Sequence, residues 1–248
     1  MLVFEPAYHG MTLGALAASS RSHFREPFVS HLQPFVERLP FACATEEIAS
    51  LLSREPRIGC VLVEPIVGRE GVLVPPDGWL RALAELCSRA GVLLAVDEIL
   101  TGFGRTGARF AVDHENVRPD LICCGKALAG GLPIAAVAGK REVMAAWKYP
   151  GEARHTATFV AHPLACAAAL ACLDVLESDV FRRLAARPRP TSKPVFRTGL
   201  NVFRASNGFE VAAVFGVSSW SRLTARRSLP GALAKRVSCC SRVVAMVG

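Results

Sequence analysis

The segment 91–126 constrains the fold of this chain more than any other part of the sequence. An apolar run at 92–96 ends in Asp97, and a second apolar run at 121–124 is followed one residue later by Lys126. Short apolar runs of this kind are typical of buried strands, and open α/β sheets bind ligands at the carboxyl ends of their strands. We therefore expect an acid and an amine at two strand ends. The residues alone leave open whether they form a buried salt bridge or a functional site.

The rest of the chain up to residue 180 alternates between apolar strands and helices, which predicts an α/β fold with a mainly parallel sheet between helices. The predicted strands are Leu2–Phe4, Gly59–Val63, Val92–Val96, Leu121–Cys124 and Ile134–Val137. The predicted helices are Thr12–Ala18, one capped by Thr45, one capped by Asp77 and ended by Gly91, and Ala161–Glu177. Residues 19–40 show little periodicity, so we expect a surface excursion there.

Charge divides the chain into two parts. Residues 1–180 hold 16 Lys and Arg against 20 Asp and Glu, whereas residues 181–248 hold 13 against one. We predict a large-domain fragment at 1–180 and an atypical basic segment at 181–248. A nucleic-acid-binding appendage is disfavoured, because the charges are scattered and aromatic residues are few. Translation in a shifted frame after about Val180 explains the loss of acidic residues and of periodicity better.

Several classes of protein are disfavoured by the sequence. The nine cysteines show no disulfide-framework spacing, no long apolar run predicts a membrane span, and the N-terminus lacks a signal-peptide pattern, so we expect a cytoplasmic chain. No metal-ligand spacing is present, since His155 and His162 lie seven residues apart. The G-x-G-x-x-G run at 102–107 is separated from Asp97 by four residues and opens no helical pattern, which disfavours a dinucleotide site.

Five separated blocks of the sequence stand out: FEPAYHGMTLGALAAS, VLVEPIVGREG, VDEILTGFGRTG, PDLICCGKALAGGLPIAAVAG and ARHTATFVAHPLACAAALA. Over about residues 2–178, these blocks resemble the class III aminotransferases, which depend on pyridoxal 5′-phosphate (PLP), and they follow that family's order. The resemblance implies the large domain of a fold-type I PLP-dependent transferase. It also implies a homodimer with its active site at the subunit interface.

The resemblance assigns catalytic roles to Lys126 and Asp97. Lys126 matches the lysine that forms the Schiff base with PLP and later moves a proton, a task that requires a primary amine. Asp97 matches the carboxylate that pairs with the pyridine nitrogen, and a negative charge there favours the protonated ring.

Four further residues match cofactor-binding positions of the family. Tyr8 matches the aromatic residue that stacks on the cofactor ring, and His9 matches a group that supports Asp97. Ile99 matches the residue that packs on the opposite face of the ring. Thr158 matches a threonine that reaches the phosphate of the cofactor in the neighbouring subunit.

The chain also departs from the family pattern. Leu100 stands where many members have Gln, and Val67 and Arg69 stand where several ω-amino-acid-specific members have Gln and Glu, so substrate identity is not carried over. The small-residue phosphate loop that precedes the Tyr-His-Gly turn in the family, and the small domain with its substrate arginine, are not found in this sequence. We expect a chain truncated at its N-terminus and altered at its C-terminus.

The predicted function is transamination, in which Lys126 and PLP move an amino group from an amino donor to a keto acid or aldehyde. One alternative is a catalytically silent family member, truncated or frame-shifted, or an interaction subunit. A further alternative is a PLP-dependent aminomutase or racemase, because these enzymes share the scaffold.

Overall fold

The computed structural model describes residues 1–32, 36–146, 157–179 and 181 of the chain. They belong to two compact units, each of which is described by itself. The first unit comprises Met1–Thr101 and Phe110–Asp120, and the second comprises Gly102–Arg109 and Leu121–Gly248. The predicted basic segment 181–248 lies outside the described residues except for Phe181, so the predicted domain boundary at residue 180 stays a prediction.

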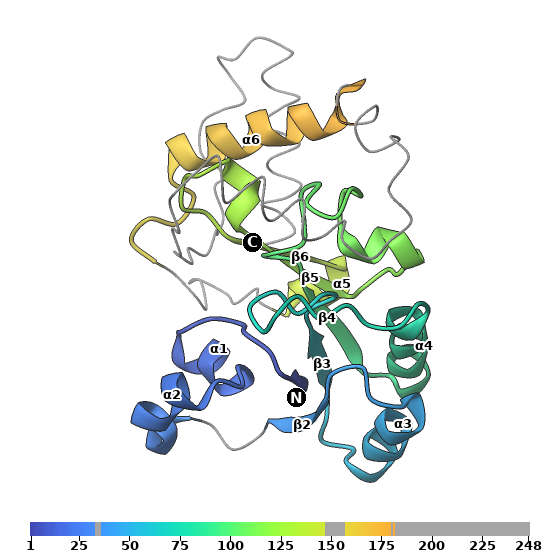
Figure 1. Cartoon of the computed structure of the whole chain (residues 1–248). Helices are drawn as coiled ribbons and strands as arrows, with labels where there is room; N and C mark the ends of the chain where they lie inside the picture. Colours follow the sequence, from blue (N-terminus) through green and yellow to red (C-terminus); the bar gives the residue numbers. More distant parts are fainter. Residues whose placement is uncertain (33–35, 147–156, 180, 182–248) are drawn as a thin grey trace. The chain divides into compact units, whose positions relative to one another are not determined.

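The first unit contains four strands interleaved with helices (Figure 1). Its elements are β1 (Leu2–Glu5), α1 (Leu13–Ala18), α2 (Ser22–Arg25), the 3₁₀ helix η1 (Glu26–His31), β2 (Glu37–Pro40), α3 (Thr45–Arg54), β3 (Cys60–Val63), α4 (Trp79–Ala90), β4 (Leu93–Asp97) and the 3₁₀ helix η2 (Ala111–Glu115). The strands lie in the order β2-β1-β3-β4, and all three pairings between them are parallel. The predicted α/β fold with a mainly parallel sheet is therefore confirmed.

Strand β2 corrects the prediction of a surface excursion over the whole of residues 19–40. It pairs with β1 along its whole length, from Leu2 opposite Glu37 to Glu5 opposite Pro40. Its sequence, ERLP, carries no apolar run because an edge strand needs only one partner and leaves much of its surface in water. The edge position also tolerates Pro40, which has no N–H to donate.

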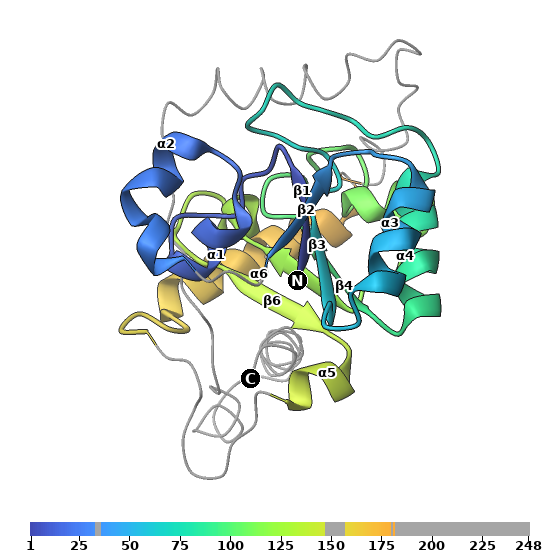
Figure 2. The same ribbon diagram turned by 90° about the horizontal axis from the view of Figure 1, so that it is seen from below.

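The hydrophobic core of the first unit lies between the sheet and helices α3 and α4. Both views of the molecule show these two helices on one side of the strands and α1 and α2 on the other (Figures 1 and 2). The core side chains come from the strands, the two helices and the segment around η2: Leu2, Phe4, Ile48, Leu52, Ile58, Val61, Val63, Trp79, Leu80, Leu83, Cys87, Leu94, Val96, Val112 and Val117. Burial of these side chains stabilises the sheet, and the sheet holds the strand ends in place.

The predicted helix caps were wrong in detail. Thr45 is the first residue of α3, and Ala44 precedes it without a side-chain cap. Helix α4 begins after Gly78 (φ 83°) rather than at Asp77. The exposed N–H groups of α4 are instead satisfied from a distance, because the carboxylate of Glu115 accepts the N–H of Gly78 at 3.1 Å and that of Arg81 at 2.9 Å.

The second unit contains two strands and two α-helices among its described residues. Its elements are β5 (Leu121–Cys124), the 3₁₀ helix η3 (Lys126–Ala129), β6 (Ala136–Gly139), α5 (Arg141–Ala145) and α6 (Pro163–Glu177). β5 and β6 pair antiparallel, and β6 begins two residues later than the predicted strand. In the described part of the chain, no helix is long and apolar enough to cross a membrane.

Candidate functional site

Polar side chains follow three neighbouring parallel strands of the first unit, at the edge where these strands end. Tyr8 and His9 follow β1, Glu64 follows β3, and Asp97 is the last residue of β4. Because parallel strands direct their carboxyl ends to one edge, the sheet brings these side chains together. Glu64 and Asp97 are both buried there.

The His9 imidazole holds the Asp97 carboxylate. Nδ1 of His9 lies 2.8 Å from Oδ2 of Asp97, and the two side chains are only 3% and 8% exposed. The other carboxylate oxygen, Oδ1, accepts the backbone N–H of Ile99 at 3.1 Å. Nε2 of His9 is buried and has no hydrogen-bond partner among the described residues, which is uncommon for a buried polar atom.

Glu64 holds two turns of the site, a role that we did not predict from the sequence. Its carboxylate accepts the N–H of Tyr8 at 2.8 Å and the N–H of Gly68 at 3.3 Å. Burial raises the pKa of the Glu64 carboxyl, and the two N–H donors and His9 only partly offset that effect. The signal was present in the sequence, since Glu64 follows the buried strand β3 just as Asp97 ends β4.

The Tyr8 ring carries an arginine on one of its faces. The guanidinium carbon of Arg69 lies 4.3 Å from the centroid of the Tyr8 ring and 5.9 Å from that of Phe24. These two rings lie 6.1 Å apart in a tilted arrangement. Arginine over an aromatic face is a cation–π contact, so the exposed Arg69 side chain is held against the Tyr8 ring. The predicted contact between Tyr8 and the cofactor ring is not tested by this arrangement.

The turn that carries Arg69 is tied to the segment before α2. The side chain of Arg21 donates to the carbonyl of Arg69 at 3.0 Å and pairs with the Glu70 carboxylate. The turn itself is closed by paired backbone hydrogen bonds between Val67 and Leu73, each 3.0 Å long. Arg69 therefore lies in a turn that is held by hydrogen bonds, both from Arg21 and within its own backbone.

Leu100 fills space next to Gly68. A Cβ atom added at Gly68 would lie 1.5 Å from Cδ2 of Leu100, so the glycine lets the Leu100 side chain approach the turn. At position 100, where many family members have Gln, this chain therefore has an apolar side chain that lies next to Gly68. Ile99, beside it, is half-buried, and its backbone N–H holds Asp97.

Glu98, the second carboxylate of the opening segment, supports the fold beneath the site. Its side chain is fully buried, and it accepts the N–H of Val112 at 2.9 Å and the hydroxyl of Thr101. Burial raises the pKa of this carboxyl. Glu98 ties the loop after β4 to η2, and Asp97 alone of the pair faces the site residues.

Lys126 and Thr158 belong to the second unit and are described separately from Asp97. Lys126 is exposed and opens η3 directly after Gly125, with a backbone φ of 43°. A left-handed φ is uncommon for a residue other than glycine and often occurs at functional sites. Thr158 is exposed in the turn before α6.

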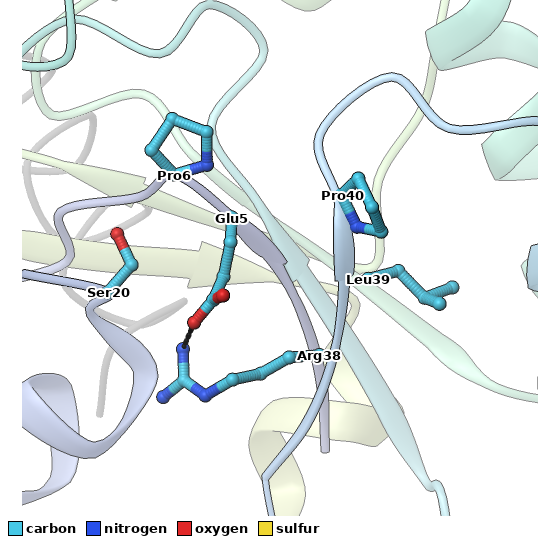
Figure 3. Close-up of a pocket in the computed structure, with 6 residues that line it drawn as sticks. All are labelled: Glu5, Pro6, Ser20, Arg38, Leu39 and Pro40. Carbon is cyan, nitrogen blue, oxygen red and sulfur yellow. Dashed lines mark hydrogen bonds and ion pairs between the residues drawn. The ribbon is translucent and has the colours of Figure 1, made fainter.

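A separate pocket of about 430 Å³ lies near the ends of β1 and β2 (Figure 3). It is lined by Glu5, Pro6, Ser20, Arg38, Leu39 and Pro40. The charges there are already paired, because Arg38 donates to Glu5 at 2.8 Å and also to the carbonyl of Ala17. Burial lowers the pKa of the Arg38 guanidinium. None of the predicted site residues lines this pocket.

The described ranges contain no cluster of metal-binding side chains. No group of three or more His, Cys, Asp or Glu side chains that could hold a metal ion occurs in the part of the chain that the structure describes. The polar groups gathered at the strand ends of the first unit are carboxylates, an imidazole, a phenol and a guanidinium.

Comparison with known proteins identifies the family. Acetylornithine aminotransferase of Methanopyrus kandleri is 43% identical over 180 residues, which are 72% of this chain and 44% of that protein. The structure of ornithine aminotransferase from Toxoplasma gondii matches with a TM-score of 0.68 at 38% identity, covering 75% of this chain and 42% of that one. Adenosylmethionine-8-amino-7-oxononanoate aminotransferase from Methanocaldococcus jannaschii matches with a TM-score of 0.67 at 31% identity, covering 73% and 45%.

These matches confirm the resemblance and the fold predicted from the sequence. The chain spans less than half the length of each of these relatives. The family description "Aminotransferase class-III" matches residues 1–200, which is most of the chain. The chain therefore belongs to the class-III aminotransferase family.

Proposed function

We propose that this chain carries the PLP-binding core of a transaminase that moves an amino group between an amino donor and a keto acid or aldehyde. The observation that carries the proposal is the buried Asp97 carboxylate, held by His9 at 2.8 Å and by the Ile99 N–H at 3.1 Å. A carboxylate fixed at a strand end in this way is suited to a cationic ring nitrogen.

The residues present fit PLP. The group needs an anionic partner for its ring nitrogen, an aromatic or aliphatic surface for its ring and a primary amine for its aldehyde. Asp97 supplies the anion, Tyr8 and Ile99 supply the surfaces, and Lys126 supplies the amine. The buried Nε2 of His9 lacks a hydrogen-bond partner among the described residues, which supports a site whose polar groups await a ligand.

Each residue has a distinct task in the proposal. Lys126 would hold PLP through its amine and, once that amine is released, would move a proton. Asp97 would favour the protonated ring nitrogen, and His9 would orient Asp97 through Nδ1. PLP, when bound, serves as the electron sink for amino-group transfer.

A homodimer is part of the proposal. Thr158, exposed in the turn before α6, would reach the cofactor phosphate of the neighbouring subunit, so that each site needs both chains. Light scattering with and without PLP tests this point. A monomer that binds PLP as well as a dimer does would contradict the role of Thr158.

Absorbance spectroscopy of the 248-residue chain tests the proposed function. Added PLP is expected to give the visible band of lysine-bound cofactor, and an amino donor is expected to remove it. K126A should abolish the band, whereas K140A, which removes another exposed lysine of the second unit, should keep it. If the unmutated chain gives no band, the proposed function is wrong and the catalytically silent alternative holds.

A further inference from the structure

We infer that Arg69 is an anion-recognition residue that binds a carboxylate of the amino substrate. This inference rests on the proposed function and adds a substrate class to it. The starting point is the contact between the Arg69 guanidinium and the Tyr8 ring, 4.3 Å apart. Tyr8 follows β1 in the candidate site, after Pro6 and Ala7. Arg69 therefore places a positive charge beside the residues proposed to bind the cofactor.

The Arg69 charge has no acidic partner. Its side chain is exposed, and no carboxylate within the described ranges lies within ion-pair distance of its guanidinium. Arg21 nearby pairs with Glu70, so that pair adds no net charge. The turn therefore presents one uncompensated positive charge at the Tyr8 ring.

The arginine is also pre-positioned. A guanidinium that lies over an aromatic ring still has N–H groups that the ring does not use, and a planar carboxylate can accept two parallel hydrogen bonds from them. Tyr8 is fixed by Glu64, and the turn of Arg69 is fixed by Arg21 and by the Val67–Leu73 backbone bonds. A group held in this manner loses little side-chain entropy when it binds an anion.

A carboxylate and a phosphate share the chemistry that a guanidinium recognises, so the test separates the two. Isothermal titration calorimetry on the full chain, with and without PLP, measures the affinity for glutarate, its neutral diamide and inorganic phosphate. R69Q is expected to weaken glutarate binding by roughly tenfold or more. R69K should give an intermediate loss, because lysine keeps the charge but not the planar fork.

R57Q is the matched control. Arg57 is also an arginine of the first unit, and its side chain is 86% exposed and paired with Glu55. R57Q removes one positive charge, as R69Q does. R57Q should leave glutarate affinity unchanged.

Two outcomes overturn the inference. Equal glutarate affinity in R69Q and the unmutated chain contradicts it. R69Q that weakens the binding of phosphate and of PLP but not of glutarate also contradicts it, because that result would assign Arg69 to the cofactor phosphate. The PLP absorbance band is recorded separately, and its absence in the unmutated chain would contradict the proposed function. Glutarate titration of the same chain still tests Arg69.

Discussion

The carboxylate of Glu64 accepts the backbone N–H of Tyr8 at 2.8 Å, which links the end of β3 to the turn after β1. The same carboxylate accepts the N–H of Gly68, next to Arg69. One buried side chain thus holds the backbone of Tyr8 and of Gly68, the residue before Arg69. Burial is the largest cause of the raised pKa of the Glu64 carboxyl, and the negative charge of Asp97 raises that pKa further.

Glu64 makes stability depend on pH in a defined direction. Its folded-state pKa is raised above the ordinary value of about 4.3. A raised carboxyl pKa gives a contribution to stability that is complete below the unfolded pKa and is lost as pH rises through the folded pKa. We therefore expect the free energy of unfolding of E64Q, relative to the unmutated chain, to increase as pH rises from about 4 towards 7.

Urea unfolding followed by tryptophan fluorescence at several pH values measures this difference. E85Q, at an exposed position of α4, is the control and should show much less change. A difference between E64Q and the unmutated chain that stays constant over the pH range would contradict the prediction.

The His9–Asp97 pair predicts a coupled loss of stability and cofactor affinity. H9A leaves one oxygen of the buried Asp97 carboxylate without its partner, and we expect a loss of about 1–3 kcal/mol in the free energy of unfolding. It should also weaken PLP binding, because Asp97 is no longer oriented. H23A, at an exposed histidine, serves as the control in the same unfolding and PLP titrations. Equal effects of H9A and H23A would show that the pair is not important.

Gly68 and Leu100 are expected to be energetically coupled. A methyl group at Gly68 would lie 1.5 Å from Cδ2 of Leu100, so G68A should cost about 1–3 kcal/mol through overpacking. The L100A substitution opens that space. A double-mutant cycle in urea should therefore show that G68A costs less in the L100A background than alone. Strict additivity of the two changes would contradict the contact.

Glu115 is expected to act as a remote cap of helix α4. E115A removes the acceptor for the N–H groups of Gly78 and Arg81, and the loss of a helix cap typically costs about 0.5–2 kcal/mol. D77A should have a smaller effect, since Asp77 provides no cap bond. Thermal unfolding of both variants tests this. A larger loss in D77A than in E115A would support the cap predicted from the sequence.

The fold was predictable where the sequence pattern reflects burial. The apolar runs of β1, β3 and β4 are buried on the core face, and a buried strand must be apolar. Strand β2 was missed because its single pairing lies at an edge, where polar residues and proline are tolerated. The caps at Thr45 and Asp77 were predicted from local preference, which a distant carboxylate overrides at α4.

The site was predictable to the extent that single residues match the family. The ends of two apolar runs indicate Asp97 and Lys126, and the resemblance to the family adds Tyr8, His9, Ile99 and Thr158. The structure shows the His9–Asp97 contact that the resemblance implies. Glu64 was not chosen because its role depends on two backbone N–H groups that are distant in the sequence from each other. The cation–π contact of Arg69 with Tyr8 likewise depends on how two turns meet, which no local pattern encodes.

The central claim is that Lys126 binds PLP covalently, and the most direct measurement locates that bond. The chain is incubated with PLP, reduced with borohydride and digested, and the modified peptide is identified by mass spectrometry. We predict a single major phosphopyridoxyl modification on Lys126, which is absent in K126A and retained in K140A. No modification, or modification spread over other lysines with Lys126 untouched, would contradict the account.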